Sequence, residues 1–360
     1  MMRVFIPSDI YFSIPDRELF ILTRPFKIAT GWGNDFSVLS RWDLANANFL
    51  YEDDPAKASV MLLPYSINLY YSSGNKNRLK VYDELCKRYS LLGYAFISGD
   101  RGIEYSSLRN IVFFRMGGFQ RQLNSNNRGF PVFLSDQLFS IYGKEQPEIR
   151  EKKDLPIIGF CGHASSSELK RLKELLKLTW INLQRAIKNP MRRDWEPFFP
   201  SVWYRAFLLK QLQGSALVKT NFILRDRYRA GATTKEDMQA TTLEYYHNIK
   251  ESDYVLCVRG GGNFSVRLYE TLMMGRIPVF INTDCLLPFF DAINWREHVV
   301  WINWEDREHI PKLIYEFHSK LSSSDFRNLQ LSNRNLWKDR LSVKGVFFML
   351  KDELSRVGKV

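Results

Sequence analysis

The residues best suited to chemistry lie in one stretch, 254-YVLCVRGGGNFSVRLYETLMMGRIPVFI-281, where an apolar run is broken by arginines, glycines and a glutamate. Three consecutive glycines follow the first apolar run: Gly260, Gly261 and Gly262. Because they carry no Cβ atom, they let the backbone adopt left-handed angles and approach a ligand closely. Arg259 and Arg267 carry planar guanidinium groups that match phosphate oxygens. The stretch therefore predicts a site for an anion such as a diphosphate.

A helix is predicted directly after the glycines, beginning near Val266 and capped by Asn263 or Ser265. Its N-terminus favours negative charge because its free N–H groups and its dipole point toward the glycines. Glu270 lies on the same helix. A carboxylate there repels phosphate but can accept hydrogen bonds from the two hydroxyls of a ribose, so the set predicts a nucleoside-diphosphate site. A structural alternative remains open, in which a tight glycine turn precedes an ion pair between Arg267 and Glu270.

The elements that must position these residues are short apolar strands. Nine runs rich in β-branched and aromatic residues recur along the chain: 2–7, 59–64, 94–98, 111–114, 157–161, 221–225, 254–258, 277–281 and 299–302. Most are apolar throughout, which is typical of strands buried on both faces of a parallel sheet. Helical periodicity lies between several of them, as in 78–93, where Gly93 is predicted to end the helix. The alternation predicts an α/β fold with doubly wound lobes.

Two lobes and a tail account for the length of the chain. The predicted boundaries are 1–150 for an N-terminal lobe, 151–330 for a C-terminal lobe and 331–360 for a helical tail that packs back on the N-terminal lobe. The polar segment 143–156 is predicted to link the lobes. A long basic helix is predicted over 165–189, and its charged face is either solvated or in contact with an acidic acceptor or a membrane.

The sequence 253-DYVLCVRGGGNFSVRLYETLMMGRIPVFINTDCLLPFFDAINW-295 resembles the donor-binding signature of the exostosin family of glycosyltransferases. That signature has an apolar strand, Arg-Gly, a Ser-x-Arg-x-x-Glu helix, Gly-x-Ile-Pro-Val, and then Leu-Pro-Phe and a tryptophan. Weaker similarity extends to 53-DDPAKASVMLLPYSINLY, 94-YAFISGDRG and 157-IIGFCGHAS. The resemblance is therefore strongest in the second half of the chain.

The resemblance implies an inverting, metal-independent glycosyltransferase with two facing Rossmann-like lobes, the GT-B architecture. The implied partners are a UDP- or GDP-linked sugar, which is a substrate and not a cofactor, and a glycan or lipid-linked glycan acceptor. The chain contains no Asp-x-Asp triplet and its five histidines lack ligand spacing, so no metal site is predicted. Arg259, Arg267 and the helix N-terminus are then expected to stabilise the leaving diphosphate.

An inverting transfer needs a base that takes the proton of the acceptor hydroxyl. In two-lobed transferases the acceptor side is the N-terminal lobe. Asp100, directly after the strand 94–98, is the first candidate, and Asp35 is the second, although Asp100 also suits a plain turn. His163 follows the strand 157–161 and is expected either to reach the sugar or diphosphate or to be an ordinary loop residue. The family's histidine before this aspartate is Gly99 here, which leaves a silent sugar-nucleotide or glycan-binding scaffold as an alternative function.

Composition limits the remaining classes. The 360 residues are 45% hydrophobic and 14% aromatic, which suffices for real cores, and the net charge is +12. That charge indicates an anionic partner, and a peripheral contact with a membrane surface is compatible with it. No nucleic-acid partner is predicted because the chain lacks helix-turn-helix, zinc-finger and RNP signatures. Scattered cysteines and the lack of a signal peptide or long apolar run predict a cytoplasmic location.

Overall fold

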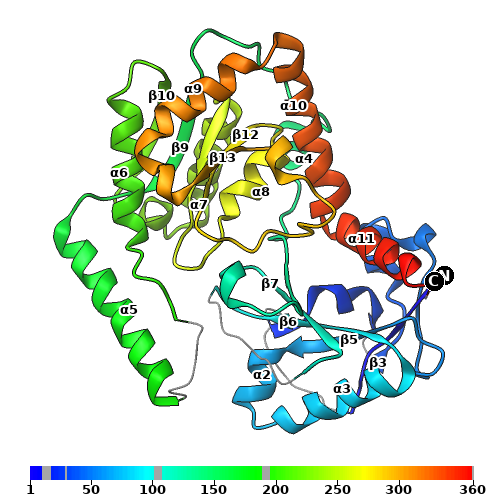
Figure 1. The fold of residues 1–360 in the computed structure, drawn as a ribbon. Coiled ribbons are helices and arrows are strands. Elements are labelled where there is room, and N and C mark those ends of the chain that lie inside the picture. The colour runs from blue at the N-terminus through cyan, green and yellow to red at the C-terminus, as the bar shows by residue number, and fades with distance from the viewer. Residues whose placement is uncertain (10–17, 29–30, 101–107, 189–194, 359–360) are drawn as a thin grey trace.

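The computed structural model describes residues 1–9, 18–28, 31–100, 108–188 and 195–358, which form two α/β lobes (Figure 1). The described N-terminal lobe contains a six-stranded parallel sheet in the order β4-β1-β5-β6-β7-β8. Its strands are β1 (Met2–Phe5), β4 (Phe49–Tyr51), β5 (Val60–Ser66), β6 (Leu92–Ile97), β7 (Ile111–Arg115) and β8 (Asn127–Gly129). Beside it lie the hairpin strands β2 (Lys27–Ile28) and β3 (Gly31–Trp32) and the helices α1 (Phe36–Arg41), α2 (Ile67–Ser72) and α3 (Lys76–Tyr89). Helix α4 (Gln137–Tyr142) packs instead on the core of the C-terminal lobe, where it buries Leu138 (Figure 1).

The described C-terminal lobe contains a five-stranded parallel sheet in the order β10-β9-β11-β12-β13. Its strands are β9 (Ile157–His163), β10 (Lys219–Arg225), β11 (Tyr254–Cys257), β12 (Ile277–Asn282) and β13 (Val300–Asn303). Its helices are α5 (Glu168–Lys188), α6 (Ser201–Gln213), α7 (Lys235–Lys250), α8 (Val266–Met273), α9 (Ile310–Lys320) and α10 (Ser323–Leu336). Separate apolar cores lie under α7 and α8 and under α6 and α9, so helices cover both faces of the sheet. The predicted α/β fold of two Rossmann-like lobes is confirmed.

All nine apolar runs that were predicted as strands are strands. Every residue of β5 and of β11 is buried, which explains why these runs are apolar throughout instead of alternating. The four cysteines are buried and free, as expected of small apolar side chains without a disulfide partner.

The prediction that Gly93 ends the first long helix is wrong. Helix α3 ends at Tyr89, and Ser90 adopts a left-handed conformation (φ 52°) while its N–H donates to the carbonyl of Cys86. Gly93 lies instead in β6. A Cβ atom at this position would lie 2.6 Å from Sγ of Cys86, so glycine is needed where the strand packs directly against the helix.

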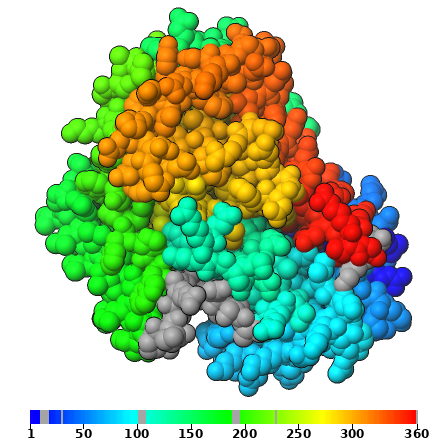
Figure 2. Space-filling view, viewed as in Figure 1, coloured from blue at the N-terminus to red at the C-terminus, as the bar shows by residue number. Residues whose placement is uncertain are grey.

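The C-terminal tail was predicted to be helical over 331–360, and the structure divides that segment between the end of α10 and a second helix. A π-helical turn follows α10, and α11 (Val343–Arg356) then begins. Ser342 interrupts the helix because its backbone is extended, and its side chain caps α11 by accepting a hydrogen bond from the N–H of Gly345. Helix α11 buries four apolar side chains in the N-terminal core: Val346, Phe347, Leu350 and Leu354. Figure 2 shows this helix against the N-terminal lobe.

The predicted linker lies along the C-terminal lobe. Arg150 donates from Nε to the buried carboxylate of Asp253 (2.6 Å), and its backbone exchanges two hydrogen bonds with the Gln330 side chain (2.9 Å each). In the sequence, the strands of one sheet precede this segment and the strands of the other sheet follow it. The lobe boundaries at residues 150 and 330 stay predictions.

Loops of the two lobes meet beside the glycine stretch. The N–H of Gln120 donates to the carbonyl of Asp284 (3.0 Å). The buried amide of Asn263 donates to the carbonyls of Gly118 (3.0 Å) and Thr283 (2.9 Å), one from each lobe. Asn263 therefore joins the lobes.

Candidate functional site

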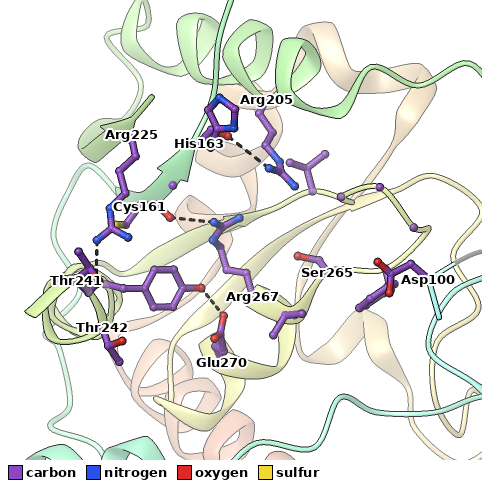
Figure 3. Close-up of a pocket in the computed structure, with 18 of the residues that line it drawn as sticks. Asp100, Cys161, His163, Arg205, Arg225, Thr241, Thr242, Ser265, Arg267 and Glu270 are labelled. Carbon is purple, nitrogen blue, oxygen red and sulfur yellow. Dashed lines mark hydrogen bonds between the residues drawn. The ribbon is translucent and has the colours of Figure 1, made fainter. Parts of the chain in front are cut away.

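A cavity of about 450 Å³ opens at the carboxyl ends of β9, β10 and β11. Strand order reverses between β9 and β11, and ligands of open α/β sheets bind at such a switch point. Most of the lining comes from the C-terminal lobe, and Asp100 contributes from the N-terminal lobe. Figure 3 shows Asp100 and Arg225 at opposite sides of this pocket.

Arg267 is held in place by its surroundings. It donates from a terminal nitrogen to the carbonyl of Cys161 (3.0 Å), and its guanidinium carbon lies 4.4 Å from the ring centroid of Phe160. Gly162 makes room for it, since a Cβ atom there would lie 2.9 Å from the guanidinium. Nε of Arg267 is buried without a hydrogen-bond partner in the protein. The protein therefore leaves part of the hydrogen-bonding capacity of this guanidinium unused.

Two further arginines line the pocket, and neither was predicted. Arg205 of α6 donates to the carbonyls of His163 (3.4 Å) and Arg259 (3.3 Å). Arg225 at the end of β10 donates to the carbonyl of Thr241 (2.9 Å) and to the Glu244 carboxylate (2.5 Å). The Nε atoms of both arginines are buried without a partner in the protein. Burial lowers the pKa of Arg205 to about 10, helped by the positive charge of Arg267, so it stays charged at neutral pH.

His163 lines the same pocket, and its Nε2 is also buried without a partner in the protein. Burial lowers the pKa of His163, and the positive charges of Lys170 and Arg205 lower it further. The ring is therefore neutral near pH 7. An unpaired buried nitrogen carries a desolvation cost, which an anionic ligand at this site would relieve.

Glu270 lies in the pocket wall, as predicted, and is oriented by two tyrosines of α7. The hydroxyl of Tyr245 donates to Oε2, and that of Tyr246 donates to Oε1 at 3.3 Å. Burial and the nearby Glu270 charge raise the pKa of Tyr245 well above its usual range, so Tyr245 remains a donor. A carboxylate oxygen can accept more than one hydrogen bond, so this arrangement leaves capacity for a ligand hydroxyl.

The glycines do not adopt the left-handed angles that we expected, because none of the three is among the glycines with positive φ. Gly260, Gly261 and Gly262 all line the pocket. A Cβ atom at Gly262 would lie 2.2 Å from the carbonyl oxygen of Asp100, whereas one at Gly261 would meet nothing within 4 Å. Close approach is therefore needed at Gly262, and the group that approaches is the N-terminal lobe.

Arg259 and Asn263 do not line the pocket, although both were predicted to bind the donor. Arg259 is buried, forms an ion pair with Glu196 (3.3 Å) and lies over the ring of Phe119 (5.0 Å). Neither Asn263 nor Ser265 caps α8 through its side chain, because Asn263 is used between the lobes. Ser265 occupies the cap position and lines the pocket.

The two candidate bases lie in different surroundings. Asp100 lines the pocket, two residues after Ser98, whose N–H is fixed by Asn68 (3.0 Å). Gly99 has φ 89°, a conformation that a histidine would adopt only with strain. Asp35 does not line the pocket: its carboxylate caps α1 and accepts hydrogen bonds from the N–H groups of Ser37 and Val38. A hydrogen bond from the Ser37 hydroxyl has the largest effect in lowering the pKa of Asp35, and the backbone N–H groups lower it further.

Within the described residues no group of three or more His, Cys, Asp or Glu side chains could hold a metal ion together. No helix in the described part of the chain is long and apolar enough to span a bilayer.

Residues 204–317 match the family model of the Exostosin GT47 domain. A probable glucuronosyltransferase of Oryza sativa subsp. japonica is 44% identical over 69 residues, which are 19% of this chain and 16% of that relative. A probable beta-1,4-xylosyltransferase of Arabidopsis thaliana, IRX10L, is 34% identical over 70 residues, 19% of this chain and 17% of that relative. The resemblance to the exostosin family is confirmed for this part of the chain, while the match spans about a sixth of the curated relatives.

Among solved structures, the crystal structure of TarM aligns with 84% of this chain and 55% of its own, at 9% identity and a TM-score of 0.37.

Proposed function

We propose that this protein is a glycosyltransferase that moves a sugar from a UDP- or GDP-linked donor to a hydroxyl of a glycan or lipid-linked glycan, with inversion and without a metal ion. The observation that carries the proposal is the set of buried, unpaired N–H donors and ring nitrogen around one cavity, from Arg205, Arg225, Arg267 and His163. The Exostosin GT47 match over 204–317 supports the same reaction. In this proposal the nucleotide sugar is a substrate and the chain needs no cofactor.

The proposed reaction is a single displacement. The acceptor oxygen attacks the anomeric carbon, and the bond from that carbon to the diphosphate oxygen breaks, with the electron pair leaving on the diphosphate. Asp100 receives the proton of the acceptor hydroxyl. Arg267 and Arg205, together with the N-terminus of α8, stabilise the charge that develops on the diphosphate. Glu270 accepts hydrogen bonds from the ribose.

Product formation with a panel of UDP- and GDP-sugars and glycan acceptors tests this function. A thermal-shift screen of nucleoside diphosphates supports the assay, because a ligand that binds only the folded state raises the melting temperature. Binding without transfer to any acceptor would favour the alternative of a silent sugar-nucleotide-binding scaffold. The absence of both binding and transfer would contradict both functions.

The first prediction is that transfer survives excess EDTA, because arginines and a helix N-terminus supply the positive charge at the diphosphate. The measurement compares initial rates with and without the chelator. Loss of activity that manganese restores would assign the cationic role to a metal.

The second prediction concerns the ribose contact. Glu270→Gln should weaken nucleotide affinity by about 1–3 kcal/mol, because hydrogen bonds to a charged group are lost. Titration calorimetry with the nucleoside alone should show the same loss as the nucleoside diphosphate. Arg267→Ala is the matched comparison on the same helix, and it should weaken the diphosphate more than the nucleoside. Equal losses for both ligands in Arg267→Ala would make Arg267 a structural residue.

The third prediction concerns His163. Its pKa is lowered in the free protein, and a diphosphate beside Nε2 would raise it, so binding should take up a proton. Affinity for a nucleotide sugar should therefore rise as the pH falls through the usual histidine range. A nucleotide sugar is the suitable ligand because its diphosphate is substituted at both ends and therefore has no group that titrates in that range. His163→Gln should remove this pH dependence, and an unchanged pH profile would place His163 away from the diphosphate.

A further inference from the structure

Helix α5 carries a row of apolar side chains that the described protein leaves uncovered. Six of them are between 49% and 74% exposed: Leu169, Leu172, Leu176, Trp180, Leu183 and Ile187. At about 100° per residue, these positions lie within an arc of about 80° and so form one stripe along the helix. In Figures 1 and 2 the helix lies along the left edge of the molecule. Soluble monomers rarely expose a continuous apolar surface of this kind without a partner.

The other face of α5 fixes the helix to the lobe, so the stripe is held outward. Ile181 and Arg185 are buried, and Arg185 forms an ion pair with the buried Glu196 (3.3 Å). Asn182 adds two hydrogen bonds to the backbone of Glu196 (2.8 and 2.9 Å). The orientation of the stripe is therefore set by the packing of the helix.

Exposed lysines border the stripe. Lys170, Lys173 and Lys177 follow one side of it, within about 120° of its centre on the same helical projection, and none forms an ion pair with a described residue. Arg171, by contrast, lies on the inner side, where it pairs with Glu168 (3.1 Å) and lies over the ring of Trp203 (4.4 Å). The exposed surface of α5 is thus an apolar stripe with a positively charged border.

We propose that α5 docks this protein on the surface of an anionic lipid bilayer. The apolar stripe would enter the boundary between headgroups and acyl chains, and the three lysines would face lipid phosphates. Trp180, 59% exposed in the middle of the stripe, suits that boundary because its ring is apolar and its N–H is polar.

Charge complementarity selects a bilayer over a second copy of the chain. Each copy carries a net charge of +12, so pairing two stripes would bring together two positively charged molecules and their lysine borders. An anionic bilayer supplies both the apolar layer and the negative charge.

Docking on α5 also affects the pocket. The helix begins five residues after His163, which lines the cavity, so a docked helix keeps the cavity near the bilayer surface. If the proposed function holds, this position suits a lipid-linked acceptor. The docking itself does not depend on sugar transfer.

Vesicle cosedimentation tests the proposal with the full chain, on phosphatidylcholine vesicles and on vesicles that also contain phosphatidylglycerol. The wild type should bind the anionic vesicles, and binding should fall with added salt. The double variant Leu172→Glu/Leu176→Glu should have an affinity for the anionic vesicles that is lower by about tenfold or more. The matched control is Phe36→Glu/Phe139→Glu, which adds the same charge at side chains of α1 and α4 that are 71% and 56% exposed, and it should bind like the wild type.

A triple variant, Lys170→Gln/Lys173→Gln/Lys177→Gln, provides an independent test if the glutamate variant does not fold. It should lower affinity for anionic vesicles by on the order of 10²-fold and reduce the salt dependence. Equal vesicle binding by the wild type and the folded variants would overturn the proposal. A second result would also overturn it: the wild type is a dimer that does not bind vesicles, and Leu172→Glu/Leu176→Glu makes it monomeric. The stripe would then be the contact surface between two copies of the chain. Transfer to a soluble acceptor should be unchanged in Leu172→Glu/Leu176→Glu, which separates this result from a failure of the proposed function.

Discussion

Replacing Asp100 by asparagine should lower the turnover of sugar transfer by about 10²–10⁴-fold while nucleotide affinity stays nearly unchanged. Asparagine has almost the same shape, but its side chain cannot take the proton of the acceptor hydroxyl. Asp100 is the acidic residue that the N-terminal lobe contributes to the described lining of the cavity. The measurement is the rate at saturating donor, with donor affinity determined separately by calorimetry.

Asp35→Asn is the matched control for this variant. Asp35 caps α1 and does not line the cavity, and asparagine caps helices about as well as aspartate. Transfer and melting temperature should therefore both stay near the wild-type values. If Asp100→Asn retains more than about a tenth of the wild-type turnover, Asp100 is not the general base, since general-base catalysis contributes at least about 10²-fold.

The sequence predicted the parts of the site that are close together along the chain. Arg267, Ser265 and Glu270 lie on one helix after one strand, so their spacing alone brought them to one place. Arg205 was missed because nothing in the local pattern of α6 distinguishes it from a surface arginine. Arg225 could have been found, since it ends a predicted parallel strand, and ligands bind at the carboxyl ends of such strands.

Arg259 and Asn263 lie outside the lining of the cavity for one physical reason, and their predicted donor contacts stay predictions. Residue type indicated a phosphate contact and a helix cap, but long-range partners decided the outcome, namely Glu196 for Arg259 and the carbonyl of Gly118 for Asn263. In the N-terminal lobe, β4 and β8 were not predicted because each has only three residues and β8, Asn127–Gly129, has no apolar side chain. Such edge strands are defined by their neighbours in the sheet and not by their own pattern.

The contact between Gly262 and Asp100 gives the second large expected effect. Gly262→Ala should lower turnover by on the order of 10²-fold, because its methyl group would lie 2.2 Å from the carbonyl oxygen and 2.6 Å from Cβ of Asp100. Asp100 has little room to retreat, since a Cβ atom at Gly117 would also lie 2.2 Å from the same oxygen. The glycine loop and the proposed base must therefore move apart by a fraction of an ångström or more, and transfer is sensitive to such displacement.

Gly261→Ala is the matched control one residue away. A methyl group there meets nothing within 4 Å, so the protein alone tolerates it. Nucleotide affinity should be nearly unchanged in Gly262→Ala, because Arg267 and Glu270 belong to the C-terminal lobe and keep their partners. Initial rates and calorimetry on both variants show whether the glycine loop serves the contact between the lobes or the approach of the ligand. If Gly261→Ala weakens nucleotide binding and Gly262→Ala transfers normally, the glycines serve the approach of the ligand and not the contact between the lobes.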